Sequence, residues 1–145
     1  MINKNQLTER SFTPSQLSGF DGAHSIQLPV DFIHDLSKAD SLQAVLDTIA
    51  YCISHVFDAD RASITLQDTE EYLKLYSISG NHAIPMDFKI PIGQTFVGRV
   101  FACAKLIICD DLAQSDELDC KMLSEHGMGT CMDAPMVHNG VCIGT

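Results

Sequence analysis

Positively charged residues are scarce in this chain of 145 residues. Nine Lys and Arg face nineteen Asp and Glu, which gives a formal net charge of -10, and the cations stand isolated along the sequence. An acidic surface of this kind repels phosphate backbones and anionic lipid heads. The composition therefore argues against nucleic acid or a membrane surface as a partner.

Long apolar runs are also missing. No stretch approaches the roughly 20 residues of a membrane span. The polar start MINKNQLTER lacks the apolar segment of a signal peptide. We therefore expect a cytoplasmic protein.

The cysteines lack the spacing of a metal site. No C-x-x-C pair occurs, and the spacings His126 to Cys131 and His138 to Cys142 each combine a single His with a single Cys, whereas structural zinc sites use closely spaced pairs. We expect free, largely buried thiols and no metal centre, although a lone His82 or His126 leaves a haem ligand open. The six cysteines are Cys52, Cys103, Cys109, Cys120, Cys131 and Cys142.

Hydrophobic periodicity predicts the order of the elements. Apolar residues recur at three- and four-residue steps in two segments near the start, which predicts two helices. Alternation at every second residue then predicts a hairpin, and shorter apolar segments predict the rest. The expected helices are Val30 to Lys38, Ser41 to Val56, one opening at Gly93, and 116–126. The expected strands are 61–66, 73–79, 88–92, 106–109, 131–137 and 141–145.

This order of elements predicts an α+β fold. Antiparallel hairpins separated by helices form a central, mostly antiparallel sheet of about five to six strands with helices on both faces. Residues 1–28 carry Pro and Gly among polar residues without a sustained period, so we expect a polar leader or linker there. The folded domain is expected over residues 29–145.

Three stretches carry a resemblance to a known family. They are SLQAVLDTIAYCISHVFDADRASITLQD, FKIPIGQTFVGRVFACAKLIICDDL and APMVHNGVCIGT. In this order they resemble the first helix and strand, the G-x-x-x-x-G helix start with its I-x-D strand end, and the P-x-x-x-x-G-x-x-x-G hairpin of GAF domains, small-molecule-sensing relatives of the PAS fold. The resemblance runs from about Asp31 to Thr145. It implies that the last strand and a closing helix continue past Thr145, so we expect a piece of a longer signalling protein.

The resemblance also implies a pocket between one face of the sheet and the segments 93–104 and 110–129. Asp133 has two interpretations, because a carboxylate within a strand is costly unless it is paired or wet. It is either a ligand contact or a solvent-facing strand position. The candidate pocket residues are Phe96, Val97, Phe101, Asp110, Met122, Cys131 and Asp133.

The function implied by the resemblance is that of a sensory or regulatory domain in bacterial-type signal transduction. Such a domain is not itself catalytic. It binds a small molecule, dimerises through its N-terminal helices, or does both, and it controls a separate output domain. The ligand and any cofactor stay unidentified.

Several alternatives stay open beside this one. A free methionine sulfoxide reductase would use Cys103, Cys109 or Cys120, although the cysteine expected in the G-x-x-x-x-G helix start is absent. A bilin could attach to Cys120, although Lys121 follows it where the family has His. Cyclic-nucleotide binding is a further alternative, but this chain lacks the N-K-x-F-D-E run that accompanies such sites in phosphodiesterases. The last alternative is a ligand-free module that only dimerises.

Overall fold

The computed structural model describes residues 9–13 and 27–145. Within this part of the chain the helices are α2 (Val30–Lys38), α3 (Leu42–Val56), α4 (Phe96–Cys103) and α5 (Leu118–Glu125), with 3-10 turns η2 (Ile92–Gln94) and η3 (Leu112–Gln114). The strands are β1 (Glu9–Phe12), β2 (Arg61–Gln67), β3 (Tyr72–Gly80), β4 (Lys89–Pro91), β5 (Leu106–Cys109), β6 (Cys131–Asp133), β7 (Met136–His138) and β8 (Val141–Gly144). The predicted α+β class is confirmed.

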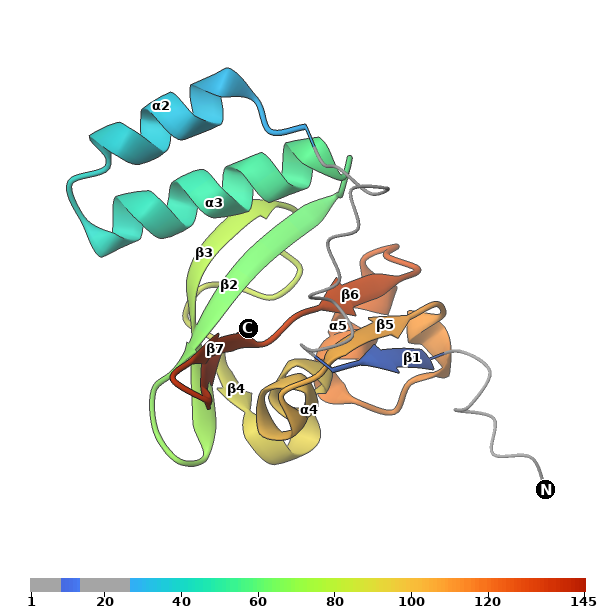
Figure 1. Ribbon diagram of the computed structural model, residues 1–145. Helices are drawn as coiled ribbons and strands as arrows, with labels where there is room; N and C mark the ends of the chain where they lie inside the picture. Colours follow the sequence, from blue (N-terminus) through green and yellow to red (C-terminus); the bar gives the residue numbers. More distant parts are fainter. Residues whose placement is uncertain (1–8, 14–26) are drawn as a thin grey trace.

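The strands form two antiparallel sheets. The larger has the order β4-β3-β2-β8-β7 and the smaller the order β1-β5-β6. Helix α3 packs on β2 and β3 with α2 alongside it, while α4 contacts β4 and β8 from the other side (Figure 1). Helices therefore cover both faces of the larger sheet, as expected, but the strands are divided between two sheets.

The division falls at Pro135, inside a segment predicted to be one strand. Proline has no backbone N–H and cannot donate to a sheet ladder. Strand β6 ends before it and pairs with β5, whereas β7 begins after it and pairs with β8. The expected hairpin of 131–137 with 141–145 is therefore confined to β7 and β8, and its turn places Asn139 and Gly140 at positive φ, as an Asn-Gly hairpin requires.

The expected leader of residues 1–28 contains a strand in its described part. Strand β1 pairs antiparallel with β5, with Glu9 opposite Cys109 and Phe12 opposite Leu106. Residues 1–8 and 14–26 lie outside the described residues. The sequence of β1 shows no alternation of apolar and polar residues, since Glu9, Arg10 and Ser11 are all polar. Periodicity therefore did not predict this strand.

Side-chain caps fix where the long and short helices begin. Ser41 accepts a hydrogen bond from the Ala44 N–H and stands before α3. Thr95 accepts from the Gly98 N–H, so α4 begins at Phe96 instead of at Gly93. A capping hydroxyl satisfies a helix N–H that has no partner within the helix.

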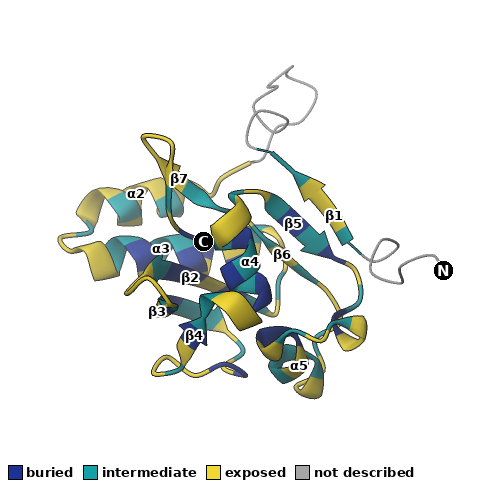
Figure 2. Cartoon of the chain, turned by 90° about the horizontal axis from the view of Figure 1, so that it is seen from below, coloured by how far each residue is buried: buried dark blue, intermediate teal, exposed yellow. Residues whose placement is uncertain are grey.

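Buried residues gather on α3, α4 and the central strands (Figure 2), and within residues 9–13 and 27–145 they form three apolar clusters. One lies between α3 and the larger sheet and includes Leu46 and Ile64. The second joins β3 and β4 to α4 and α5 through Leu73 and Leu75. The third lies between α4, α5 and the smaller sheet and includes Phe96. The space between the two sheets is thus packed mainly by α4 and α5.

Candidate functional site

Strand β6 places one carboxyl group in the interior between the sheets. Successive strand side chains point to opposite faces, and Met132, which is 55% exposed, points outward between Cys131 and Asp133. The Oδ2 atom of Asp133 is enclosed and has no hydrogen-bond partner among the described residues. The interpretation of Asp133 as a solvent-facing position is therefore wrong.

The surroundings of Asp133 favour its protonated form. Burial raises the pKa of Asp133 to about 7, and the carboxylate of Asp119 acts in the same direction. Hydrogen bonds from the Thr145 side chain and the Ala134 backbone lower the pKa without offsetting burial. The Thr145 hydroxyl lies 2.9 Å from that of Thr65. Asp133 thus ends a short polar chain, and its Oδ2 atom has no partner within the described part of the chain.

A second buried carboxylate joins α4 to α5. Asp119 is 1% exposed, and it accepts hydrogen bonds from the N–H groups of Phe96 at 2.8 Å and Val97 at 3.0 Å. Burial raises its pKa, while these hydrogen bonds lower it. The start of α4, which would otherwise attract an anion, is therefore occupied by a side chain of the protein itself.

Three thiols gather beside these carboxylates. Cys109 and Cys131 are opposite one another in the β5–β6 pairing, and Cys120 of α5 forms a hydrogen bond with Cys131. This hydrogen bond and burial raise the pKa of Cys131, and burial raises the pKa of Cys109. The two strand thiols are therefore neutral, whereas a nucleophilic cysteine needs its thiolate form.

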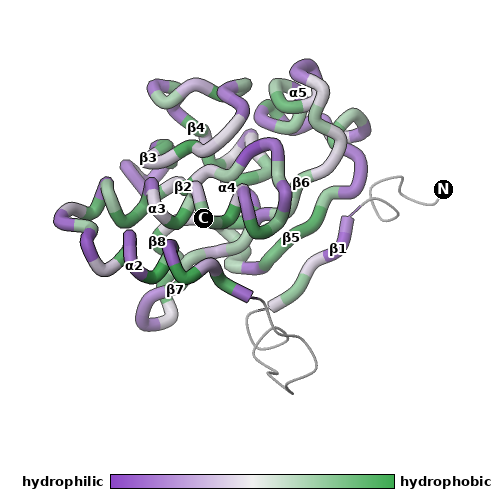
Figure 3. Tube along the Cα trace, turned by 90° about the horizontal axis from the view of Figure 1, so that it is seen from above, coloured by the Kyte–Doolittle hydropathy of each residue, from purple (hydrophilic) through white to green (hydrophobic). Residues whose placement is uncertain are grey.

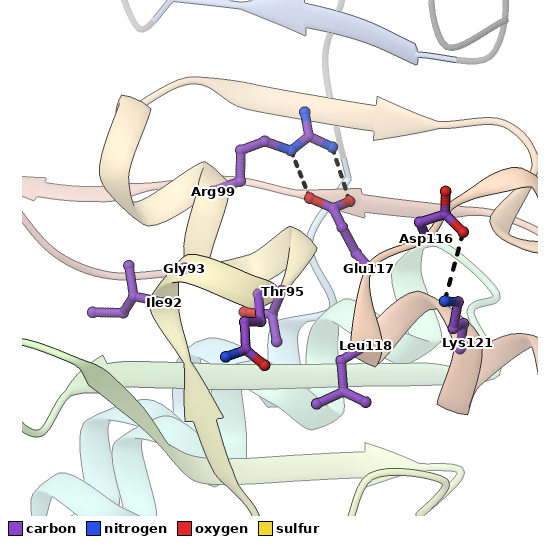
Figure 4. A pocket seen from close by; sticks show the side chains of 9 residues that line it. Ile92, Gly93, Thr95, Arg99, Asp116, Glu117, Leu118 and Lys121 are labelled. Atoms are coloured by element: carbon purple, nitrogen blue, oxygen red, sulfur yellow. Dashed lines mark hydrogen bonds and ion pairs between the residues drawn. The ribbon is translucent and has the colours of Figure 1, made fainter.

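A hollow of about 690 Å³ opens on the surface where η2 and α4 meet the start of α5. Figure 4 shows Arg99 paired with Glu117 and Lys121 directed at Asp116 across it. Arg99 Nε lies 2.7 Å from Glu117 Oε1. The charged side chains that line this hollow are thus already paired with one another.

The seven predicted pocket residues lie in three places. Phe96 and Cys131 share the cluster between α4, α5 and the smaller sheet, and Val97, Phe101 and Met122 share the cluster against β3 and β4. Asp133 is on β6 at the interior, and Asp110 is exposed and pairs with Arg10 at 2.8 Å. The seven line neither the hollow nor the smaller one beside it. Their role in binding stays a prediction.

Sequence reasoning did not find Asp119, Arg99 or the pair Thr65 and Thr145. The bonds of Asp119 to α4 span 22 and 23 positions, and the two threonines are 80 positions apart. A local pattern contains no signal for such contacts. Only the cost of placing Asp119 in a segment that also carries Leu118, Met122 and Leu123 could have marked it for attention.

Two further features are settled for residues 9–13 and 27–145. Their His, Cys, Asp and Glu side chains form no group that could hold a metal ion. Their helices are all too short or too polar to cross a membrane.

The comparison with protein families identifies the class of this domain. The description "GAF domain" matches residues 41–145. This match covers well over half of the chain, so the chain belongs to the GAF domain family. No curated protein matches it in sequence.

Solved structures share the same fold. The GAF domain of a phosphoenolpyruvate-protein phosphotransferase from Coxiella burnetii superposes with a TM-score of 0.68 at 16% identity, over 79% of this chain and 70% of that one. Residues 122 to 287 of a methyl-accepting chemotaxis protein superpose with a TM-score of 0.65 at 18% identity, over 79% of this chain and 76% of that one. Free methionine-R-sulfoxide reductase from Neisseria meningitidis, solved with its substrate, superposes with a TM-score of 0.64 at 22% identity, over 78% of this chain and 65% of that one.

Proposed function

We propose that this chain is a cytoplasmic sensory or regulatory GAF domain that binds a small molecule at Asp133 and controls an output domain without catalysis of its own. The observation that carries the proposal is the enclosed Oδ2 atom of Asp133, which lacks a partner in the described part of the chain. A buried polar atom without a hydrogen bond costs roughly 1–3 kcal/mol. A ligand that forms a hydrogen bond with this atom removes this cost.

The chemistry around Asp133 suggests the kind of ligand. Its neighbours include the Thr145 hydroxyl and the thiols of Cys131 and Cys142. Both thiols are neutral, because burial raises the pKa of Cys142 and a hydrogen bond with a neighbouring thiol, together with burial, raises that of Cys131. These groups suit a small, mostly apolar molecule with one hydroxyl or amino group directed at Asp133. The surface hollow beside Arg99 supports the proposal less, because its charged side chains are already paired.

A melting experiment tests this site. Wild-type protein is heated with a panel of small alcohols and amines, and the Asp133→Asn variant is heated with the same compounds. A compound bound at Asp133 raises the melting temperature of the wild type and not of Asp133→Asn. The variant Asp87→Asn, which changes an exposed acid in the loop before β4, keeps the response. Equal shifts in wild type and Asp133→Asn would place binding elsewhere.

Dimerisation through α2 and α3 is the second part of the proposal. All residues of α2 keep part of their surface exposed, and apolar side chains on the two helices face solvent. A second copy that covers them would bury apolar surface at roughly 25 cal/mol per Å². The exposed apolar residues of these helices are Val30, Ile33, Leu42, Tyr51 and Ile53.

A thiol-dependent methionine sulfoxide reductase is the alternative function. The meeting of Cys109, Cys120 and Cys131 favours it, as does the fold shared with the Neisseria enzyme. The raised pKa values of Cys109 and Cys131 oppose it. Consumption of free methionine sulfoxide with a thiol reductant, abolished by Cys120→Ser and kept by Cys52→Ser, would establish this activity in place of a purely regulatory role.

A further inference from the structure

Strand β1 is held on the domain by contacts that recognise its sequence. Arg99 of α4 donates two hydrogen bonds to the Glu9 carboxylate, from Nη1 at 3.0 Å and Nη2 at 2.8 Å. Arg10, the next residue, pairs with Asp110 at 2.8 Å. A bidentate guanidinium–carboxylate pair is strong and requires a specific geometry. An acidic residue followed by a basic one therefore fits this place, and the reverse order does not.

The backbone of β5 supplies the rest of the recognition. Residues 9–12 pair with residues 106–109 in one antiparallel register, and Figure 3 shows β5 as an apolar strand beside the more polar β1. Without β1, the outer edge of β5 would present unpaired N–H and C=O groups, which accept an added strand. Arg99 would at the same time lose one of its two carboxylate partners, since it also binds Glu117.

A hollow lies at the end of β1. It measures about 280 Å³ and is lined in part by Glu9, Arg99, Cys109 and Ser115. Glu9 therefore forms part of its wall. Removing Glu9 would open this hollow onto the guanidinium of Arg99, so that a carboxylate from another chain could reach it.

We propose that the edge of β5 and Arg99 together form a docking site for an extended segment in which an acidic residue precedes a basic one, and that its second occupant is the same segment, Glu9 to Phe12, of another copy of this chain. Exchange of an identical strand preserves the Glu9–Arg99 and Arg10–Asp110 pairs and the full register with β5, so the exchanged and unexchanged forms differ little in energy. Residues 14–26 link β1 to the rest of the domain along the chain, and a segment of that length can span at most about 45 Å. This proposal does not depend on a ligand at Asp133.

A peptide test separates this site from every other. The variant Glu9→Arg sets two cations against one another and vacates the site, and a labelled peptide QLTERSFTP, residues 6–14, is titrated into it by fluorescence anisotropy. We expect this peptide to bind at least tenfold more tightly than the matched peptide QLTQRSFTP. We also expect weaker binding to wild type, because the tethered strand competes at high effective concentration. Equal binding of the two peptides, or no binding, overturns the docking site.

Two controls complete the experiment. Adding Arg99→Gln to Glu9→Arg should abolish the preference for QLTERSFTP over QLTQRSFTP. If Glu9→Arg does not fold by circular dichroism, Glu9→Gln replaces it. Sedimentation of the Ile33→Asp variant, in which the proposed contact through α2 and α3 is weakened, then tests the second copy as occupant. Excess QLTERSFTP should convert dimers of this variant to monomers, and QLTQRSFTP should not. A dimer of this variant that QLTERSFTP leaves intact, or a variant that is monomeric at every concentration, overturns strand exchange, and neither result bears on Asp133.

Discussion

At the scale of single residues, Asp133 makes the stability of the domain depend on pH. Its pKa is about 7 in the native state against an ordinary value of 3.8, because burial disfavours the carboxylate. The native state therefore holds the proton more tightly than the unfolded chain does. The stability contributed by the protonated form is complete below about pH 4 and is lost as the pH rises through 7.

We predict that the free energy of unfolding of the wild type falls relative to that of Asp133→Asn between pH 5 and pH 7. Asparagine resembles the protonated acid and does not titrate, and the difference should grow by up to about 1.4 kcal/mol per pH unit. Urea unfolding of both proteins at several pH values measures it. Asp87→Asn, which changes an exposed acid before β4, serves as the control, and parallel curves for the wild type and Asp133→Asn would contradict a raised pKa.

Gly98 gives a second prediction at this scale. A Cβ atom built there would lie 2.2 Å from the backbone O of Ile92, so the start of α4 must move. We expect Gly98→Ala to lower the free energy of unfolding by about 1–3 kcal/mol, as overpacked cores do, although alanine is the better helix former. Gly93→Ala is the matched control, because nothing lies within 4 Å of its built Cβ; equal stability of the two variants would contradict the close packing.

At the scale of elements, the joint between α4 and α5 depends on Asp119. Asp119→Ala leaves the Phe96 and Val97 N–H groups without their acceptor, at roughly 1–3 kcal/mol for each buried donor. We predict a clear loss of stability in chemical denaturation. The matched control is Asp116→Ala, because the Asp116 side chain is fully exposed. This change should leave the free energy of unfolding within about 0.5 kcal/mol of the wild type. A mild effect of Asp119→Ala would mean that water replaces the carboxylate.

The elements differ in how far the sequence could predict them. Helix α3 was predictable because its apolar residues repeat at helical spacing over fifteen residues, and the β7–β8 turn because Asn139 and Gly140 tolerate positive φ. The break at Pro135 was readable in principle, since proline cannot donate to a ladder. Strand β1 was not, because its place is set by Arg99 and Asp110, which lie about 90 and 100 positions away.

The same distinction applies to the candidate site. Asp133 could be singled out because a carboxylate in an apolar strand is unusual, but its orientation depends on whether the strand faces the interior. The grouping of Cys109, Cys120 and Cys131 depends on how β5, β6 and α5 pack together. Local spacing carries no information on such packing.

At the scale of the whole molecule, the exposed apolar faces of α2 and α3 predict a dimer. Ile33 lies on α2 and is 55% exposed, and we expect it at the centre of the contact between the two copies. With excess QLTERSFTP present to exclude strand exchange, Ile33→Asp should therefore raise the dissociation constant at least tenfold in analytical ultracentrifugation, while melting temperature changes little. Asp35→Ala, a change of a polar residue on the same helix, is the control. A dimer unaffected by Ile33→Asp would place the contact on another surface.

Native mass spectrometry of the protein purified under mild conditions from its own host shows whether a ligand is bound at Asp133. We expect a small non-covalent mass on each wild-type subunit, released by collisional heating and absent from Asp133→Asn prepared in the same way. A bare wild-type subunit, or the same added mass on Asp133→Asn, would contradict the assignment of Asp133 as the anchor of a bound ligand.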